Sequence, residues 1–513
     1  MSLKDALRVV RHPLYLLQKD GTLVPQLGSA GSVHACVGYA PACLPENLGD
    51  PSFCREIGIR YPYLGGSMAK GISSAAMAEE LGRAGMLGFF GAAGLPISKV
   101  AETADRLKAS LGDIPYGFNL IHSPHEPELE QELAELYIEK GVRIIEASAF
   151  LALTLPLVRY RLHGIRRAAD GSIVTPNRII AKVSREELAA KFFAPAPEKL
   201  LRALVENGSL TVEQAELAAR VPLAQDVTAE ADSGGHTDNR PALALFPTIN
   251  SLAGRLERQY GYQCKLRVGL GGGVSTPASA AAAFAMGAAY VMTGSVNQAC
   301  VESGTSDIVR GLLAGTRQAD VTMAPAADMF EMGVTVQVLK RGTMFPMRAA
   351  KLYELYRAYG SMEEIPAAER EKLEKTMFLA PLDEIWRGTR DYFLKRDPSQ
   401  VERSERDPKH KMALVFRWYL GMGAHWAKDG AESRKMDYQV WCGPAMGAFN
   451  EWAAGSFLEA PAERKVVTVA LNILHGAAQL TRANFLRSQG IELRQEEIAP
   501  QPLEIAQVKE CLC

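Results

Sequence analysis

A histidine that follows two glycines gives the sequence its strongest chemical signal. The segment Ser233-Gly234-Gly235-His236 lies just after the apolar run Asp226–Ala231, between Asp232 and Asp238. Glycines let a backbone approach a flat ligand closely, and an imidazole titrates near neutral pH. Such a histidine suits a proton donor, a proton acceptor or a partner for an oxyanion. Histidines are more often structural, but this context favours a functional one, and His122 and His125 are weaker candidates.

Two glycine-rich segments predict a phosphate site. Gly269-Leu270-Gly271-Gly272-Gly273 runs into Val-Ser-Thr-Pro and a helical stretch, and Thr293-Gly294-Ser295 ends the next apolar run. Exposed backbone N–H groups and a helix N-terminus attract phosphate, although a triple glycine can also be a flexible turn. Neither segment has the spacing of a P-loop or of a dinucleotide-binding turn. We expect the phosphate to contact Gly271, Gly272, Gly273, Gly294 and Ser295.

Three further segments suit the ring of a flavin. Gly66-Ser67-Met68-Ala69 offers small side chains and backbone amides after an apolar run, and Asn119 places an amide within another run. Lys182 ends the run Arg178–Val183, where a cation could stabilise negative charge on a reduced flavin ring. A buried lysine needs such a partner. For Asn119, a purely structural hydrogen bond is an equal alternative.

The elements that must position these residues alternate between strand and helix. Short apolar runs separated by helical stretches occur eight times, which predicts a (β/α)8 TIM barrel. An open doubly wound sheet is the alternative. In a barrel, functional groups project from the carboxyl ends of the strands, where the segments above lie. The eight runs are Tyr61–Gly65, Met86–Phe90, Tyr116–Ile121, Val142–Ala147, Arg178–Val183, Asp226–Ala231, Leu266–Gly269 and Tyr290–Thr293.

Four regions follow from this alternation. Residues 1–60 are expected to form an irregular N-terminal arm, and residues 61–315 the barrel. A helical insertion is expected at about residues 191–221, and residues 316–513 are predicted to form a helical region that covers the substrate. All five tryptophans lie in this last region. They could form an ordinary helical core or an apolar cover over the barrel mouth.

Composition excludes several classes of protein. Lys plus Arg number 57 and Asp plus Glu 58, so no net field attracts nucleic acid or an anionic membrane. Eight cysteines without C-x-x-C pairing argue against a disulfide framework, and no zinc-ligand spacing occurs. The charged N-terminus is unlike a signal peptide, and no apolar run approaches the length of a membrane span. We expect a soluble, cytoplasmic protein without a metal site.

Taken together, these residues resemble the nitronate monooxygenase / 2-nitropropane dioxygenase superfamily of FMN barrels. Within it they look most like the PfaD family, the trans-acting enoyl reductases of polyunsaturated fatty acid synthases and trans-acyltransferase polyketide synthases. The similarity runs from about residue 36 to about residue 490. Besides the glycine and histidine segments above, it is carried by Met86–Leu95, Gly117–Pro124, Glu230–Asp238 and Trp441–Trp452.

The resemblance implies a reaction and its partners. FMN would lie across the barrel mouth, with its ring and ribityl chain at Met68, Ala69, Asn119, Lys182, Gly234 and Gly235, next to Gly66, Ser67 and Ser233. His236 would be the catalytic histidine. NADPH (or NADH) would supply the hydride, and the substrate would be an α,β-unsaturated acyl thioester carried by an acyl carrier protein. A nitronate monooxygenase and a non-catalytic docking protein of a synthase complex are the alternatives.

Overall fold

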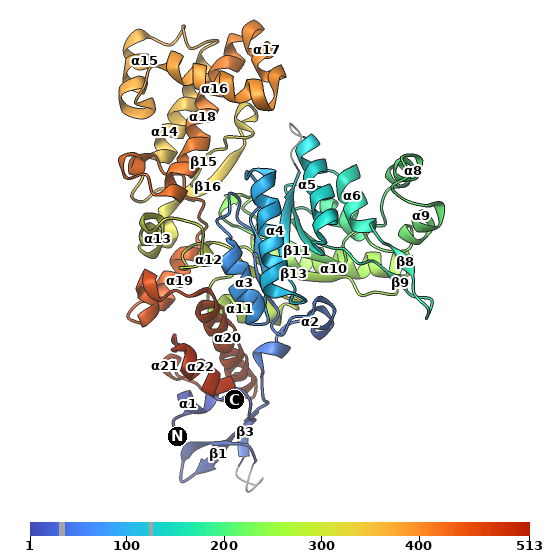
Figure 1. The fold of residues 1–513 in the computed structure, drawn as a ribbon. Helices are drawn as coiled ribbons and strands as arrows, with labels where there is room; N and C mark the ends of the chain where they lie inside the picture. The colour runs from blue at the N-terminus through green and yellow to red at the C-terminus, as the bar shows by residue number, and fades with distance from the viewer. Residues whose placement is uncertain (30–35, 123–126, 513) are drawn as a thin grey trace. The chain divides into compact units, whose positions relative to one another are not determined.

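The structure is a computed structural model of the 513-residue chain and describes residues 1–29, 36–122 and 127–512. Eight parallel strands close into a barrel in the order β10-β11-β13-β14-β4-β5-β6-β7 (Figure 1). Each predicted apolar run overlaps one of these strands, so the TIM barrel is confirmed and the open sheet is wrong. The strands are β4 (Tyr63–Gly65), β5 (Leu87–Phe90), β6 (Gly117–Ile121), β7 (Ile144–Ser148), β10 (Arg178–Val183), β11 (Asp226–Glu230), β13 (Arg267–Gly271) and β14 (Val291–Thr293).

Helices between the strands form the outer layer of the barrel (Figure 1). Local signals in the sequence fix where they begin. Ser74 accepts a hydrogen bond from the backbone N–H of Met77, and Thr276 forms a reciprocal capping box with Ser279. These helices are α3 (Ala75–Arg83), α4 (Ile97–Leu111), α5 (Pro127–Lys140), α6 (Leu155–Leu162), α7 (Glu186–Phe193), α10 (Ala242–Tyr260), α11 (Pro277–Ala285) and α12 (Ser295–Gln298).

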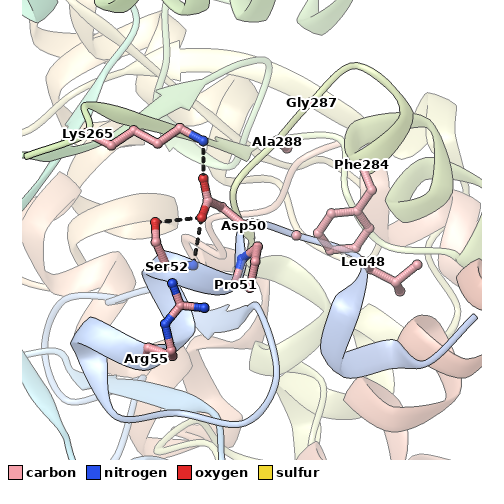
Figure 2. Close-up of a pocket in the computed structure, with 10 residues that line it drawn as sticks. Leu48, Asp50, Pro51, Ser52, Arg55, Lys265, Phe284, Gly287 and Ala288 are labelled. Carbon is pink, nitrogen blue, oxygen red and sulfur yellow. Dashed lines mark hydrogen bonds and ion pairs between the residues drawn. The ribbon is translucent and has the colours of Figure 1, made fainter. Parts of the chain in front are cut away.

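The amino end of the barrel is closed by α2 (Pro51–Ile57). The ring of Phe53 stacks on Tyr290, with centroids 4.3 Å apart, and Nε of the fully buried Arg267 lies 2.6 Å from Oδ1 of Asp226. An open hollow of about 450 Å³ lies beside this helix, where Lys265 points at Asp50 (Figure 2). None of the predicted site residues lines it. Contacts at the amino end of a barrel generally serve stability.

The predicted helical insertion is present as α8 (Glu198–Glu206) and α9 (Val212–Ala218). The Thr211–Gln214 capping box starts α9, as the sequence indicates. A short hairpin of β8 (Arg166–Arg167) and β9 (Ile173–Val174) precedes β10.

The N-terminal residues differ from the irregular arm expected over residues 1–60. After α1 (Leu3–Arg8), the strands β1 (Leu14–Lys19), β2 (Thr22–Leu27) and β3 (Cys36–Ala40) form an antiparallel sheet in the order β2-β1-β3. Pro25 lies within β2 and interrupts its strand pattern in the sequence. The proline is tolerated because β2 is an edge strand. The fully buried Arg482 on α20 (Val466–Ser488) donates hydrogen bonds to carbonyl groups just beyond α1, and so anchors this region.

The chain divides into two compact units, which also differs from the predicted regions. Unit 1 comprises residues 1–232, 238–304 and 448–513, and unit 2 comprises residues 233–237 and 305–447. The C-terminal helix α20 thus belongs with the barrel, although one helical region was expected over residues 316–513. Unit 2 also holds strands, β15 (Val321–Pro325) and β16 (Thr335–Leu339), which form a three-stranded sheet with β12 (Gly235–His236).

The rest of unit 2 is mainly helical and has its own apolar core. Trp386, Trp418, Trp426 and Trp441 pack against this core, which is the first of the two roles considered for the tryptophans. In the described residues, no helix is long and apolar enough to cross a membrane. The larger helices are α13 (Asp307–Ala314), α14 (Phe345–Ala358), α15 (Ala367–Leu373), α16 (Leu382–Arg396), α17 (Pro398–Arg406) and α18 (Pro408–Asp429).

Candidate active site

A cluster of charged side chains lies at the carboxyl ends of three adjacent barrel strands. Nζ of Lys182 on β10 is 3.4 Å from Oε1 of Glu146 on β7 and 3.2 Å from Oε1 of Glu230 on β11. Glu146 is fully buried, whereas the side chains of Lys182 and Glu230 are one-fifth exposed. Desolvation would lower the pKa of Lys182, but the charges of Glu230 and Glu146 outweigh it and raise this pKa. Lys182 is therefore a stable cation between two carboxylates.

Glu146 also fixes the loop that follows β4. The backbone N–H of Ser67 donates to Oε2 of Glu146 at 3.1 Å, and the Ser67 hydroxyl donates to Oε1 at 2.6 Å. The Ser148 hydroxyl adds a bond of 3.1 Å to Oε1. These hydrogen bonds satisfy the buried carboxylate and hold it in one orientation. The predicted residues Ser67 and Lys182 thus meet through a residue that the sequence analysis did not single out.

Asn119 combines the two roles that the sequence left open. Its side-chain oxygen accepts hydrogen bonds from the backbone N–H groups of Ala92 at 2.7 Å and Ala93 at 3.3 Å, which is a structural role. Its amide nitrogen is buried and has no hydrogen-bond partner among the described residues. Buried donors are rarely left unsatisfied. This N–H₂ group is therefore available to a polar edge of a ligand.

The phosphate-type loop after β13 has a backbone that only glycine adopts easily. Gly272 and Gly273 have φ angles of +79° and +75°, and a Cβ on Gly272 would lie 2.5 Å from the carbonyl oxygen of Ala231. Ser275, between this loop and α11, is fully buried, and its hydroxyl has no partner among the described residues. An orphaned hydroxyl beside a nine-residue helix N-terminus suits an anionic group.

The second predicted phosphate loop lies on the neighbouring strand. β14 pairs with both β13 and β4, and the backbone N–H of Gly66 donates to the carbonyl of Thr293 at 3.0 Å. Gly294 has a φ of −128°, and a Cβ there would meet no atom within 4 Å. The loops around Gly66, Gly271–Gly273 and Gly294-Ser295 thus follow three consecutive strands of the barrel, as predicted.

The residues Ser233–Thr237 belong to unit 2, although the chain enters them from Asp232 and leaves them at Asp238 in unit 1. Within unit 2, Gly235 and His236 pair with Gln337 and Val336 of β16. Nε2 of His236 lies 3.1 Å from Oδ1 of Asp328. His236 therefore has the carboxylate of Asp328 as a partner within unit 2. That His236 lies near the site residues of the barrel stays a prediction.

Both glycines before His236 have local structural reasons. A Cβ on Gly234 would lie 2.8 Å from the backbone N of Cys442, and Gly235 has a φ of +82°. The side-chain amide of Gln337 donates to the carbonyl of Ser233 at 2.7 Å. At the base of the segment, the backbone N–H of Asp232 donates to the carbonyl of Arg240 at 3.0 Å within unit 1.

Of the two weaker candidates, His125 lies outside the described residues, and His122 contacts the helix layer of the barrel. Its Nδ1 lies 2.8 Å from Oε2 of the buried Glu130 on α5, and its ring stacks on Phe150 at 5.3 Å. These contacts give it a structural role. Among the described residues, no group of three or more His, Cys, Asp or Glu side chains could hold a metal ion.

Three site residues escaped the sequence analysis: Glu146, Glu230 and Asp328. Glu146 had a usable signal, because it is a single charge in the apolar run Ile144–Ala147 of a predicted buried strand. Glu230 lies within the segment Glu230–Asp238 that carries the family resemblance, but its local pattern predicts no role for it. Asp328 is 92 residues from His236 and carries no local pattern.

The chain is similar to proteins of fatty acid and polyketide biosynthesis. Residues 359–438 match the family described as acyl-carrier-protein S-malonyltransferase, inserted helical domain. The chain is 50% identical over 506 residues to a polyunsaturated fatty acid synthase protein of Thraustochytrium sp., covering 97% of the chain and 34% of that relative. It is 44% identical over 436 residues to polyketide biosynthesis protein PksE of Bacillus subtilis, covering 85% of the chain and 56% of PksE. The chain therefore spans about a third and about half of these two relatives.

A solved structure matches over nearly its whole length. The crystal structure of the enoyl reductase domain of MlnA, from the macrolactin biosynthesis cluster of Bacillus amyloliquefaciens, has a TM-score of 0.81 and 41% sequence identity. The match covers 86% of this chain and 99% of that chain. The chain belongs to the family of the MlnA enoyl reductase domain, and the predicted resemblance to the PfaD family is confirmed.

Proposed function

We propose that the protein is an FMN-dependent enoyl reductase that acts in trans on α,β-unsaturated acyl thioesters carried by an acyl carrier protein, with NADPH (or NADH) as hydride donor. The observation that carries the proposal is the set of ligand-type groups at the carboxyl end of one barrel. It unites two glycine loops, the orphaned donors of Asn119 and Ser275, and the Lys182 cation. This set matches a ligand with a phosphate at one end and a flat polar ring at the other.

The phosphate of FMN would be held by backbone N–H groups of Gly271–Gly273, Gly294 and Ser295, with the Ser275 hydroxyl as an additional donor. Gly294 supports this assignment because the space where its Cβ would stand is open. A glycine at position 294 therefore leaves room for a ligand to lie close to the backbone.

The ring and ribityl chain would lie against Gly66, Ser67, Met68, Ala69, Asn119 and Lys182, and against the backbone of Ser233-Gly234-Gly235. The free N–H₂ of Asn119 would donate to an acceptor on the ring. The Lys182 ammonium would contact a ring oxygen or nitrogen while it keeps its two carboxylates. FMN, when bound, would accept a hydride from NADPH at N5 and deliver it to Cβ of the enoyl thioester.

His236 would complete the reaction at the other end of the double bond. Hydride addition at Cβ leaves negative charge on the thioester oxygen and requires a proton at Cα. Asp328 stabilises the protonated imidazole, which favours proton donation to Cα by His236. His236 lies in the segment Ser233–Thr237 of unit 2, and its approach to the flavin is part of this proposal.

The acyl carrier protein as partner is supported by the relatives. The MlnA match is an enoyl reductase domain, and the two protein relatives are named for polyunsaturated fatty acid and polyketide biosynthesis. Unit 2 also contains the stretch that resembles a helical domain of an acyl-carrier-protein transferase. We propose that the phosphopantetheine arm of a carrier protein delivers the enoyl chain to this enzyme.

Steady-state turnover tests the proposal. The protein, loaded with FMN, should oxidise NADPH only when a crotonyl thioester on a carrier protein or on pantetheine is present, and the product should be the butyryl thioester by mass spectrometry. The FMN-free protein is the control. A protein that cannot be loaded with FMN would support a docking role, and oxidation of a nitronate without enoyl reduction would support a nitronate monooxygenase.

A further inference from the structure

Glu146 occupies a position that no part of the proposed reaction explains. It is fully buried in the barrel interior, where a carboxylate is expensive unless it is paired and hydrogen-bonded. Its neighbours on β6 and β10 in the strand register are Asn119 and Ile180, so it lies in the layer of a predicted ring contact. A purely apolar barrel layer would need neither the Glu146 carboxylate nor the Lys182 ammonium beside it.

The contacts of Glu146 join two proposed FMN contacts that are far apart in the sequence. One carboxylate accepts both donors of Ser67 and lies against the Lys182 ammonium. The Gly66–Ala69 loop is then held to β7 from one side and Lys182 from the other. Removal of Glu146 would release the loop and leave Lys182 with Glu230 alone.

The charges of the cluster also bear on a bound cofactor. Glu146 and Glu230 are two carboxylates on either side of the Lys182 ammonium. Lys182 was expected to stabilise negative charge on a reduced flavin, but here it already lies against both carboxylates. The charge of the fully buried Glu146 opposes electron uptake by a group bound beside it.

We infer that Glu146 is a positioning residue that fixes Lys182 and the Gly66–Ala69 loop and, by its charge, lowers the reduction potential of the flavin bound there. The inference rests on the proposed function, since it requires FMN at this site. A lower reduction potential would make the reduced flavin a stronger hydride donor to the enoyl substrate. Glu146 itself need not touch the flavin.

The test is the midpoint potential of bound FMN, measured by anaerobic dye-coupled titration in the wild type, Glu146→Gln and Glu79→Gln. Glu79 is the matched control because it is a nearly buried carboxylate that accepts hydrogen bonds from Arg106 and Ser110, on the outer helix α3. We expect Glu146→Gln to raise the affinity for reduced FMN relative to oxidised FMN at least tenfold, a shift of about +30 mV for a two-electron couple. Glu79→Gln should leave the potential unchanged.

A conservative variant separates charge from geometry. Glu146→Asp keeps the charge but shortens the side chain, so FMN affinity should fall while the potential stays at the wild-type value. If Glu146→Gln binds FMN weakly, its potential is measured at saturating FMN. A potential in Glu146→Gln equal to that of the wild type, or a positive shift in Glu146→Asp, would overturn the inference and leave the proposed function standing. A wild-type protein that binds no FMN would overturn both.

Discussion

Nε2 of His236 lies 3.1 Å from Oδ1 of Asp328, so the histidine that the sequence singles out has a carboxylate partner from a distant part of the chain. Desolvation would raise the pKa of Asp328, but the hydrogen bond and charge of His236 lower it below its ordinary value. The carboxylate is thus ionised at neutral pH and favours the protonated imidazole. Both side chains are about half exposed, which limits the strength of the pair.

Replacement of Asp328 by Asn should therefore have a small effect on rate and a clear effect on its pH dependence. We expect kcat/KM to fall about 1.4- to 5-fold at pH 7, because an exposed pair contributes roughly 0.2–1 kcal/mol. If His236 donates a proton, the loss of activity with rising pH should begin at a lower pH in Asp328→Asn. His236→Ala should retain FMN and lose most of its turnover. A pH–rate profile of Asp328→Asn that superimposes on the wild type would contradict this role.

Removal of the Lys182 cation should destabilise the barrel even without FMN. In Lys182→Met, Glu146 and Glu230 both lose the ammonium that lies between them, which should lower the free energy of unfolding by about 3–5 kcal/mol. The double variant Lys182→Met/Glu146→Gln should recover much of this loss because one buried charge is gone. Urea unfolding of the FMN-free proteins measures both values. Equal stabilities of the single and double variants would refute the pairing.

The glycine loops can be tested by two alanine substitutions with different expectations. The added Cβ of Gly294→Ala would meet no atom within 4 Å, so this substitution should change the melting temperature of the FMN-free protein much less than Gly272→Ala does. It should still weaken FMN binding at least tenfold if the phosphate lies there. Gly272→Ala should lower the melting temperature itself, because its φ is positive and its Cβ would meet the Ala231 carbonyl. Fluorimetric FMN titration and thermal melts separate the two cases, and wild-type FMN affinity in Gly294→Ala would place the phosphate elsewhere.

The ion pair at the amino end of the barrel should affect stability and leave the chemistry untouched. Partial burial would raise the pKa of Asp50, but hydrogen bonds from Lys265 and Ser52 outweigh it and hold the pKa at about 2. Because the folded-state pKa lies below the unfolded value of about 3.9, this contribution is present above pH 4 and is lost as the pH falls toward 2. Asp50→Asn should cost about 1 kcal/mol at pH 7 after solvent screening.

Urea unfolding at pH 7, 5, 4 and 3 would show this difference shrinking as the pH falls, with turnover unaffected at pH 7. A difference that stays constant down to pH 3, or one that grows, would contradict the assignment of the pair.

The barrel could be predicted because each strand is buried on both faces and so reads as a short apolar run, such as Arg178–Val183, between glycines and helical stretches. The carboxyl ends of these runs then located the glycine loops and Lys182. The partners of these residues depend on strand order and on contacts between distant segments. Glu146 and Glu230 reach Lys182 only because β7 and β11 flank β10 in the closed barrel.

The regions outside the barrel were harder to predict for the same reason. β12 is two residues long and exists because Gly235 and His236 pair with β16, about one hundred residues later. The N-terminal sheet depends on pairing of β1 with both β2 and β3, and Pro25 hides the pattern of β2. Short strands stabilised by distant partners leave a weak periodic signal.

The two half-reactions of the flavin test the central claim most directly. In an anaerobic stopped-flow experiment, NADPH should bleach the flavin absorbance near 450 nm of the FMN-loaded protein, and a crotonyl thioester should then restore it with formation of one equivalent of butyryl thioester. The account predicts both steps in the wild type and a loss of the second step in His236→Ala. A flavin that NADPH cannot reduce, or that only oxygen can reoxidise while the enoyl thioester is left unchanged, would contradict it.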